Sequence, residues 1–326
     1  MSENRRLRWA VLGTGVIANE MARALRSMGR TLDAVGNRTY EKAAAFAREY
    51  GVPKVYGDYH EMFSDPDVDV IYITTPHNTH IAFLEEALSH GKHVLCEKSI
   101  TLNSEELSRA RRLAEENGAV LAEAMTIYHM PLYQELTRRV RGGELGRVNL
   151  IQLNFGSFKV YDMKNRFFSR SLAGGAMLDI GVYALSLARL FLDSNPDQVK
   201  SFVRKAPTGV DESAAIAMAN REGQLVTAAL SLHSKQPKRA VISCERGYIE
   251  IMEYPRADEA VIVDAETGVR ETVRAGRTAA ALRYELEDME RAILDGGDMK
   301  LSCTADVMEL MTALRREWGV VYPEEE

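Results

Sequence analysis

Ala10-Val11-Leu12-Gly13-Thr14-Gly15-Val16-Ile17-Ala18 decides the fold, because an apolar strand runs there into a G-x-G-x-x-A turn and then into a helical pattern. The strand is short and apolar throughout, as strands buried in a parallel sheet are. Gly13 permits a tight turn, Gly15 lets the backbone approach a pyrophosphate, and the small Ala18 lets helix and strand pack closely. Unpaired N–H groups at the start of the helix then form an anion site. The stretch predicts a phosphate-binding turn, although the same turn also occurs without a ligand.

The segment after this turn indicates which dinucleotide fits. Residues 32–36 predict a second strand, and residues 40–50 predict a helix that Thr39 can cap. An acidic residue at the end of the second strand takes the ribose 2′-hydroxyl of NAD, whereas an arginine accommodates a 2′-phosphate. This chain has Asn37 and Arg38 at that place and no acid. The pattern favours NADP over NAD, because a guanidinium pairs with a phosphate; an Arg38 that points into solvent is the alternative.

Two polar clusters follow the next predicted strands. Thr75-Pro76-His77-Asn78-Thr79-His80 follows the strand at 68–74, and Glu97-Lys98 ends the strand at 93–96. Open α/β sheets bind ligands at the carboxyl ends of their strands, so both clusters are expected near the glycine turn. The candidate cofactor-binding residues are Gly13, Thr14, Gly15, Val16, Ile17, Asn37, Arg38, Thr75, Pro76, Asn78, His80, Glu97 and Lys98. For His80 a purely structural hydrogen bond is an alternative role, and Asn78 can also cap the helix that follows.

Beyond Glu123 the pattern changes from alternating strands and helices to a strand-rich region. A helix is predicted at 131–141, strands at 151–155, 199–203, 214–219, 225–232, 240–243, 248–251 and 260–263, and closing helices at 282–294 and 305–318. The sequence therefore predicts an α/β protein of two domains. Residues 1–123 form a doubly wound parallel sheet of the Rossmann type, and residues 124–326 form an α+β domain with a large, mostly antiparallel open sheet. The terminal helix of the second domain can pack back on the first.

Composition excludes several classes of partner. The chain has 326 residues, which exceeds a comfortable single core, and a net charge of −6 without a long basic run, so nucleic acid and anionic membranes are not expected partners. The most apolar stretch, 176–192, contains Asp179 and Arg189 and predicts a core helix instead of a membrane span.

The ends and the cysteines of the sequence predict a cytoplasmic location. Residues 1–6 lack the apolar core of a secretory signal, and the three cysteines form no C-x-x-C motif. His90, His93 and Cys96 lie close together in sequence but flank a Gly-Lys turn that enters a strand, so no metal site is expected.

The ordered motifs between residues 7 and 183 resemble the Gfo/Idh/MocA family, that of glucose-fructose oxidoreductase and inositol dehydrogenase. The resemblance rests on the glycine turn, on Thr75–His80, on Gly91–Lys98 and on Gly174-Gly175-x-x-x-Asp179-x-Gly181-x-Tyr183. It implies a two-domain NAD(P)-dependent oxidoreductase whose active site lies between the domains. It also implies a homodimer or homotetramer formed through the open sheet of the second domain.

Three residues are the candidates for catalysis. The family assigns its Glu-Lys lysine the task of orienting the substrate hydroxyl, and Lys98 matches it. Asp179 and Tyr183 are four residues apart in a predicted helix, so they project from one face. A phenol titrates near pH ~10 and needs a nearby positive charge to act as a base. Many relatives have histidine at the position of Tyr183. A tyrosine here resembles the branch of the family that includes dimeric dihydrodiol dehydrogenase and xylose dehydrogenases.

Two departures from the family pattern affect these predictions. Ser99 stands where the family commonly has a proline, often preceded by a cis peptide bond. A cis peptide bond before serine costs ~2.5–4 kcal/mol, so a different local backbone is expected here. Tyr128 stands where relatives often carry arginine, which favours a neutral polyol or aldose over an acidic substrate. Arg166 is a further candidate for substrate contact, with plain surface exposure as the alternative.

Together these features predict transfer of a hydride between NADP, or NAD, and a secondary alcohol or hemiacetal carbon of a sugar, polyol or trans-dihydrodiol. The alternative is a regulator or sensor that binds NADP(H) without catalysis.

Overall fold

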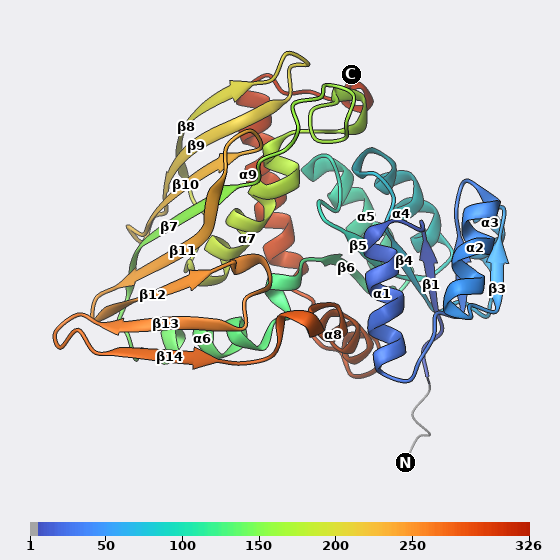
Figure 1. Ribbon diagram of the computed structural model, residues 1–326, viewed down its shortest axis with the longest axis horizontal. Coiled ribbons are helices and arrows are strands. Elements are labelled where there is room, and N and C mark those ends of the chain that lie inside the picture. The colour runs from blue at the N-terminus through green and yellow to red at the C-terminus, as the bar shows by residue number, and fades with distance from the viewer. Residues whose placement is uncertain (1–5) are drawn as a thin grey trace. The chain divides into compact units, whose positions relative to one another are not determined.

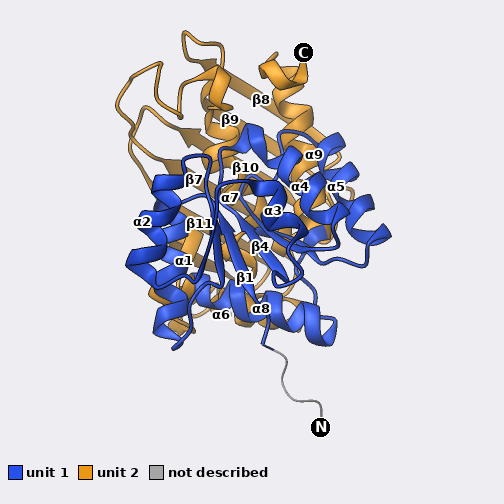
Figure 2. Cartoon of the chain, turned by 90° about the vertical axis from the view of Figure 1, so that its right-hand side faces the viewer, with its two compact units in different colours: residues 1–124, 282–301 blue, residues 125–281, 302–326 orange. Residues whose placement is uncertain are grey.

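The computed structural model describes residues 6–326, which divide into two units (Figure 2). Unit 1 holds the residues up to Ala124 together with Leu282–Leu301, and unit 2 holds Met125–Ala281 and Ser302–Glu326. The prediction that the N-terminal stretch lacks a secretory signal concerns mainly residues 1–5, which lie outside the described residues.

Unit 1 is built on a parallel sheet whose strands follow the order β3-β2-β1-β4-β5-β6. The strands are β1 (Trp9–Leu12), β2 (Ala34–Gly36), β3 (Lys54–Tyr56), β4 (Val70–Ile73), β5 (His93–Glu97) and β6 (Leu121–Ala124). The helices between them are α1 (Val16–Ser27), α2 (Tyr40–Tyr50), α3 (Tyr59–Ser64), α4 (His80–Ser89) and α5 (Ser104–Glu116). The strand order reverses at β1, which confirms the predicted doubly wound sheet. The sequence reasoning did not predict α3.

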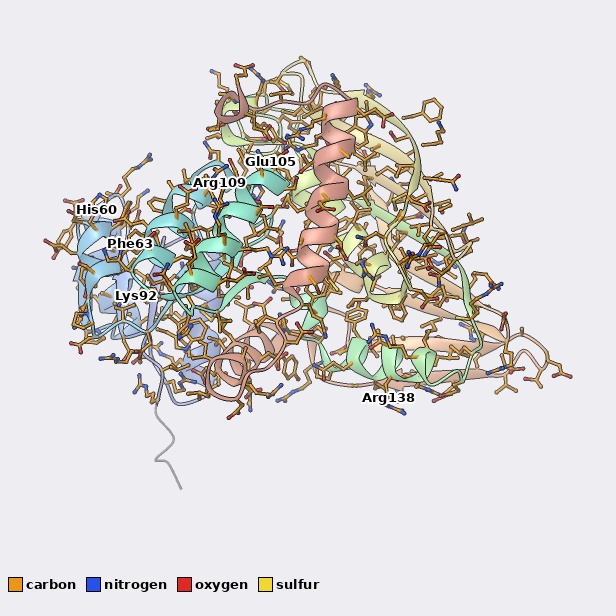
Figure 3. All side chains as sticks on the ribbon, turned by 180° about the vertical axis from the view of Figure 1, so that it is seen from behind. His60, Phe63, Lys92, Glu105, Arg109 and Arg138 are labelled. Atoms are coloured by element: carbon orange, nitrogen blue, oxygen red, sulfur yellow. The ribbon has the colours of Figure 1, made fainter. Side chains whose placement is uncertain are left out.

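Helix pairs on the outside of unit 1 are tied by charged side chains. Arg109 of α5, labelled in Figure 3, pairs with Glu85 of α4 at 2.9 Å. Lys92, in the turn before β5, is buried and donates its Nζ to the carbonyls of Asp65 and Val68 at 2.6 and 2.8 Å. The Lys92 contacts satisfy two backbone carbonyls in the turn before β4.

Helix α8 (Ala281–Asp295) completes the core of unit 1 although it comes late in the chain. Its Leu286 and Met289 are fully buried in the same apolar cluster as Trp9 and Leu25. Glu290 accepts a hydrogen bond from Trp9 Nε1 at 2.8 Å and pairs with Arg30 at 2.6 Å. Strand β1, which leads into the glycine turn, is therefore packed both by the neighbouring α1 and by α8 from the late part of the sequence.

Unit 2 holds a sheet of order β14-β13-β12-β11-β7-β10-β9-β8, in which β10 and β7 run parallel and the other neighbours run antiparallel. Its strands are β7 (Val148–Gly156), β8 (Gln198–Lys205), β9 (Asp211–Ala219), β10 (Leu225–Ser231), β11 (Gln236–Cys244), β12 (Gly247–Met252), β13 (Glu259–Asp264) and β14 (Arg270–Arg274). The helices are α6 (Pro131–Arg141), α7 (Val182–Phe191) and α9 (Leu301–Glu317). Helices α7 and α9 lie against one face of the sheet (Figure 1). The mostly antiparallel open sheet was predicted, whereas β14 was not.

The segment with Asp179 and Tyr183 differs from its prediction. A continuous α-helix was expected over residues 175–192, but Met177–Gly181 forms a π-helical turn and α7 begins only at Val182. The wider turn means that Asp179 and Tyr183 are not related by the regular i, i+4 spacing of an α-helix. By length and composition the helical residues 170–191 could cross a membrane, but 78% of their most apolar window is buried within the fold. That burial is typical of a core helix.

Candidate functional site

The glycine turn of unit 1 has the geometry of an anion site. Gly13 has φ +105°, and a Cβ there would meet Thr74 Oγ1 at 2.5 Å, so a larger residue does not fit. Gly15 caps α1 without any side-chain hydrogen bond to the first N–H groups, and a Cβ at Gly15 would meet nothing within 4 Å. The start of α1 therefore has open space beside Gly15 from which a phosphate can approach its first amides.

Amide and hydroxyl groups hold this turn in place. Asn37 Nδ2, at the end of β2, donates to Thr14 Oγ1 at 2.6 Å. Asn19 Nδ2 donates to the carbonyl of Gly15 at 2.7 Å, and Tyr50 OH donates to Asn19 Oδ1 at 2.8 Å. The turn is thus braced by β2, by α1 and by α2.

A cavity of about 660 Å³ opens beside the turn within unit 1. Of the predicted cofactor residues, it is lined by Gly13, Thr14, Gly15, Asn37, Arg38, Thr75 and Pro76. The other six, Val16, Ile17, Asn78, His80, Glu97 and Lys98, are not among its lining residues. A volume of this size suits part of a dinucleotide. The glycine turn, the bare helix N-terminus and the polar lining together fit the cofactor that the sequence predicts.

Sequence reasoning missed Lys42, Tyr59 and Phe83, which also line the cavity. Lys42 lies in the first turn of α2, four residues after Arg38, and a second cation so close to Arg38 in the sequence could have identified it. Tyr59 and Phe83 pack edge to face with ring centroids 5.3 Å apart. Burial raises the pKa of the Tyr59 phenol, and the positive charge of Arg38 opposes that shift. Within the described chain, Glu49 supplies the only carboxylate of this lining and lies in the last turn of α2.

The turn that carries Lys98 is held by two histidines of unit 1. A ring nitrogen of His77, Nε2, lies 2.9 Å from the Lys98 carbonyl. His80 is fully buried, with Nδ1 at 3.1 Å from the Ser99 carbonyl and 3.2 Å from that of Ile100, and Nε2 at 2.8 Å from that of Thr75. Burial lowers the pKa of His80, while the carbonyls around it oppose that shift. His80 thus links the strand end of β4 to the Lys98 turn.

Further contacts define the backbone around Lys98. The Lys98–Ser99 peptide bond is cis, the isomer that serine was expected to disfavour. Glu97 accepts a hydrogen bond from the phenol of the buried Tyr72, and Glu123 accepts one from the Ile100 N–H at 3.1 Å. The Lys98 side chain itself is half-buried.

The remaining candidates lie in unit 2. Asp179 and Tyr183 are half-buried, and Asp179 Oδ1 is 3.8 Å from the guanidinium of Arg166. Arg166 is 62% exposed and stacks over the ring of Phe167 at 4.4 Å. Tyr128 is buried at 4% exposure.

No group of three or more histidine, cysteine or acidic side chains suited to a metal is found within residues 6–326. His93 Nδ1 accepts a hydrogen bond from the Val120 N–H at 2.9 Å, and Cys96 is fully buried.

A parallel sheet, a helix N-terminus after β1 without a side-chain cap and a cavity lined by Arg38 and Lys42 define a dinucleotide-binding protein. Residues 7–125 match the model of the oxidoreductase family with an NAD-binding Rossmann fold, and residues 133–250 match that of the GFO/IDH/MocA C-terminal domain. The chain belongs to the Gfo/Idh/MocA family of NAD(P)-dependent oxidoreductases.

Similar proteins cover almost the whole chain. A trans-1,2-dihydrobenzene-1,2-diol dehydrogenase from Xenopus laevis is 29% identical over 97% of this chain and 99% of its own length. A 3-ketoreductase from Actinomadura kijaniata, solved with NADP and TDP-benzene, has a TM-score of 0.84 at 21% identity and covers 96% of this chain and 98% of its own. A levoglucosan dehydrogenase solved with NADH and levoglucosan has a TM-score of 0.84 at 19% identity, over 95% and 98% of the two chains.

Proposed function

We propose that this protein is an NADP-preferring dehydrogenase or reductase for a secondary alcohol or hemiacetal carbon of a sugar, polyol or trans-dihydrodiol. The observation that carries the proposal is a pair of cations, Arg38 after β2 and Lys42 in the first turn of α2. Arg38 and Lys42 line the same cavity as the glycine turn, where a 2′-phosphate needs positive charge. The bound nicotinamide would supply the hydride chemistry.

Lys98 is proposed to orient the substrate hydroxyl. It follows β5, which is the neighbour of β4, and β4 is the neighbour of β1. Because these strands are parallel, Lys98 and the glycine turn both lie at the carboxyl-terminal edge of the sheet. An ammonium group there can hold an alcohol oxygen and stabilise negative charge that develops on it.

Tyr183 is proposed to exchange the hydroxyl proton. A phenol is a competent acid in the reducing direction, and a neighbouring cation that lowers its pKa makes it a base in the oxidising direction. Asp179 is proposed to accept a hydrogen bond from the substrate, and Arg166, at 3.8 Å from it, to balance its charge. The buried Tyr128, in place of a cation, favours a neutral substrate.

The first experiment measures reduced cofactor by absorbance with NADP and NAD, across aldoses, inositols, polyols and a trans-dihydrodiol. Lys98→Ala and Tyr183→Phe are each expected to lower kcat by about 10²–10⁴-fold with little change in the dissociation constant of NADP. Tyr248→Phe, a tyrosine change in β12 of unit 2, is the matched control. Near-normal turnover in both test variants would refute the assignment.

The exposed face of the sheet in unit 2 supports a homo-oligomer. Phe202 of β8 is 83% exposed and Leu225 of β10 is 50% exposed. Phe202 pairs in register with Ala215, and Ala217 pairs with Thr227, so small side chains lie between the two large ones. Lys200 and Arg204 lie on either side of Phe202 on the same face of β8, so the apolar centre of the patch is bordered by cations at this edge. An apolar centre with a charged rim suits packing against the same patch of a second copy.

A further inference from the structure

Asp211 lies at the point where the segment with Asp179 and Tyr183 begins. It is fully buried in unit 2, at the start of β9, and its Oδ2 accepts a hydrogen bond from the Met177 N–H at 2.5 Å. Met177 is the first residue of the π-helical turn. A Cβ built on Gly175 would lie 2.2 Å from Asp211 Oδ1, so the glycine makes room for the carboxylate. The start of the segment is shaped around this side chain.

The C-terminal residues of unit 2 hold the other side of the same junction. Tyr322 OH donates to the Gly174 carbonyl at 2.7 Å. The Arg315 guanidinium stacks over the Tyr322 ring at 4.6 Å and pairs with Glu325 at 2.8 Å. Arg315 and Tyr322 are the charged and titratable groups that face Asp211, with Glu325 behind Arg315.

We propose that Asp211 is a positioning residue that holds the N-terminal amides of the segment 177–191 and so sets the place of Asp179 and Tyr183. A π-helical turn leaves its first N–H groups without partners inside the helix, and a carboxylate is the acceptor best suited to them. The negative charge of the carboxylate is also stabilised by the positive end of the helix dipole. The inference rests on the proposed function, because it matters for catalysis only if Tyr183 exchanges the proton.

This arrangement gives the reaction a dependence on pH. Burial raises the pKa of Asp211 to about 7, against the opposing influence of the Met177 amide and the Arg315 charge. Below that pH the protonated carboxyl group is a weaker acceptor for the amides. We therefore expect kcat to fall as the pH falls through about 7.

The test compares Asp211→Asn, which keeps the shape and one acceptor oxygen, with Asp211→Ala. The control is Glu212→Gln, because Glu212 is the next residue, is 1% exposed and faces Arg204 instead of residues 174–177. Two quantities are measured: kcat and KM from pH 6 to 9, and backbone hydrogen exchange of residues 176–183 at pH 8. We expect Asp211→Asn to lower kcat by about 10–100-fold, with the KM for NADP within about twofold, and to lose the fall of kcat below pH 7. Exchange is expected to be faster in both Asp211 variants than in the control.

Three outcomes separate the possibilities. A wild-type kcat and pH profile in Asp211→Asn, with only a change in melting temperature, overturns the positioning role. If the wild type turns over no substrate in the panel, the proposed function fails, and the exchange measurement still decides the structural part. If the hydrogen exchange of residues 176–183 is unchanged in Asp211→Asn, Asp211 does not hold this segment, and this result stands even if Asp211→Ala does not fold.

Discussion

Arg38 and Lys42 reach the same cavity from the end of β2 and from the first turn of α2. We predict that Arg38→Ala raises the KM for NADP by about 10–100-fold, because each lost charged contact to a phosphate costs about 1.5–3 kcal/mol. The KM for NAD, which lacks the 2′-phosphate, should change less than about threefold. Steady-state kinetics with both cofactors measures the difference.

The matched control for this prediction is Arg48→Ala. Arg48 is an exposed arginine in the last turn of the same helix and is not part of the cavity lining. An equal loss of NADP affinity in Arg48→Ala and Arg38→Ala would mean that the effect comes from net charge alone. An equal loss for NAD and NADP in Arg38→Ala would contradict a contact with the 2′-phosphate.

His80 supports a prediction on stability. His80→Ala removes a buried ring that faces three carbonyl oxygens, so the free energy of unfolding should fall by about 1–3 kcal/mol. His60→Ala is the control, because the His60 side chain is 76% exposed and its loss should lower the free energy of unfolding less than His80→Ala does. Urea denaturation measures both variants, and equal losses would show that His80 does not brace the Lys98 turn.

The same residue gives a pH dependence with a defined sign. Burial lowers the pKa of His80 in the folded state below its unfolded value of ~6.5. Below pH ~6.5 the unfolded chain binds a proton that the folded chain does not, so the stability should fall as the pH falls. The free energy of unfolding should depend less on pH in His80→Ala than in the wild type. If its slope between pH 7 and 5 is the same in both proteins, His80 does not cause the dependence.

At the scale of elements, the turn between β1 and α1 contains Gly13 at positive φ and is the proposed binding site of the pyrophosphate. Gly13→Ala places a Cβ against Thr74 at φ +105°, so we expect it to abolish measurable NADP binding in a calorimetric titration. Gly29→Ala is the control, since Gly29 also has positive φ, at +70°, but nothing lies within 4 Å of its Cβ position. That change should cost about 1 kcal/mol of stability and leave the dissociation constant of NADP unchanged. Tight binding by Gly13→Ala would place the pyrophosphate elsewhere.

The elements that the sequence predicted well are those whose local pattern agrees with their surroundings. Strand β1 has the apolar pattern of a buried strand, and helix α6 begins at Pro131 and is followed by Gly142; both elements were found. No local pattern predicted the π-helical turn, whose first amide donates to Asp211, a residue distant in sequence from Met177. Strand β14 escaped prediction because four of its five residues are exposed and its pattern is mostly polar.

The candidate site divides in the same way. The glycine turn and Arg38 could be found because a local motif contains them, and Lys98, Asp179 and Tyr183 because they match a family pattern. Tyr59 and Phe83 lie on α3 and α4 and meet at the cavity only through the fold. No spacing in the sequence relates them to the glycine turn.

At the scale of the whole molecule, the sheet of unit 2 predicts the state of association. Phe202→Asp should convert an oligomer into a monomer at micromolar concentration, because it places a charge where the second copy would remove the patch from water. Sedimentation velocity measures the change. Val269→Asp is the control, since Val269 is 64% exposed between β13 and β14, away from the β8–β10 patch. A wild-type monomer, or an unchanged oligomer in Phe202→Asp, would contradict the proposed interface.

The late position of α8 has a consequence for biosynthesis. Leu286 and Met289 complete the apolar core around Trp9, so the cofactor-binding unit cannot finish folding until residues 282–301 have left the ribosome. The first strand to emerge therefore remains with one side of its core uncovered until the ribosome has translated past residue 301. Premature termination before α8 would yield a product with the whole glycine motif that aggregates instead of binding nucleotide.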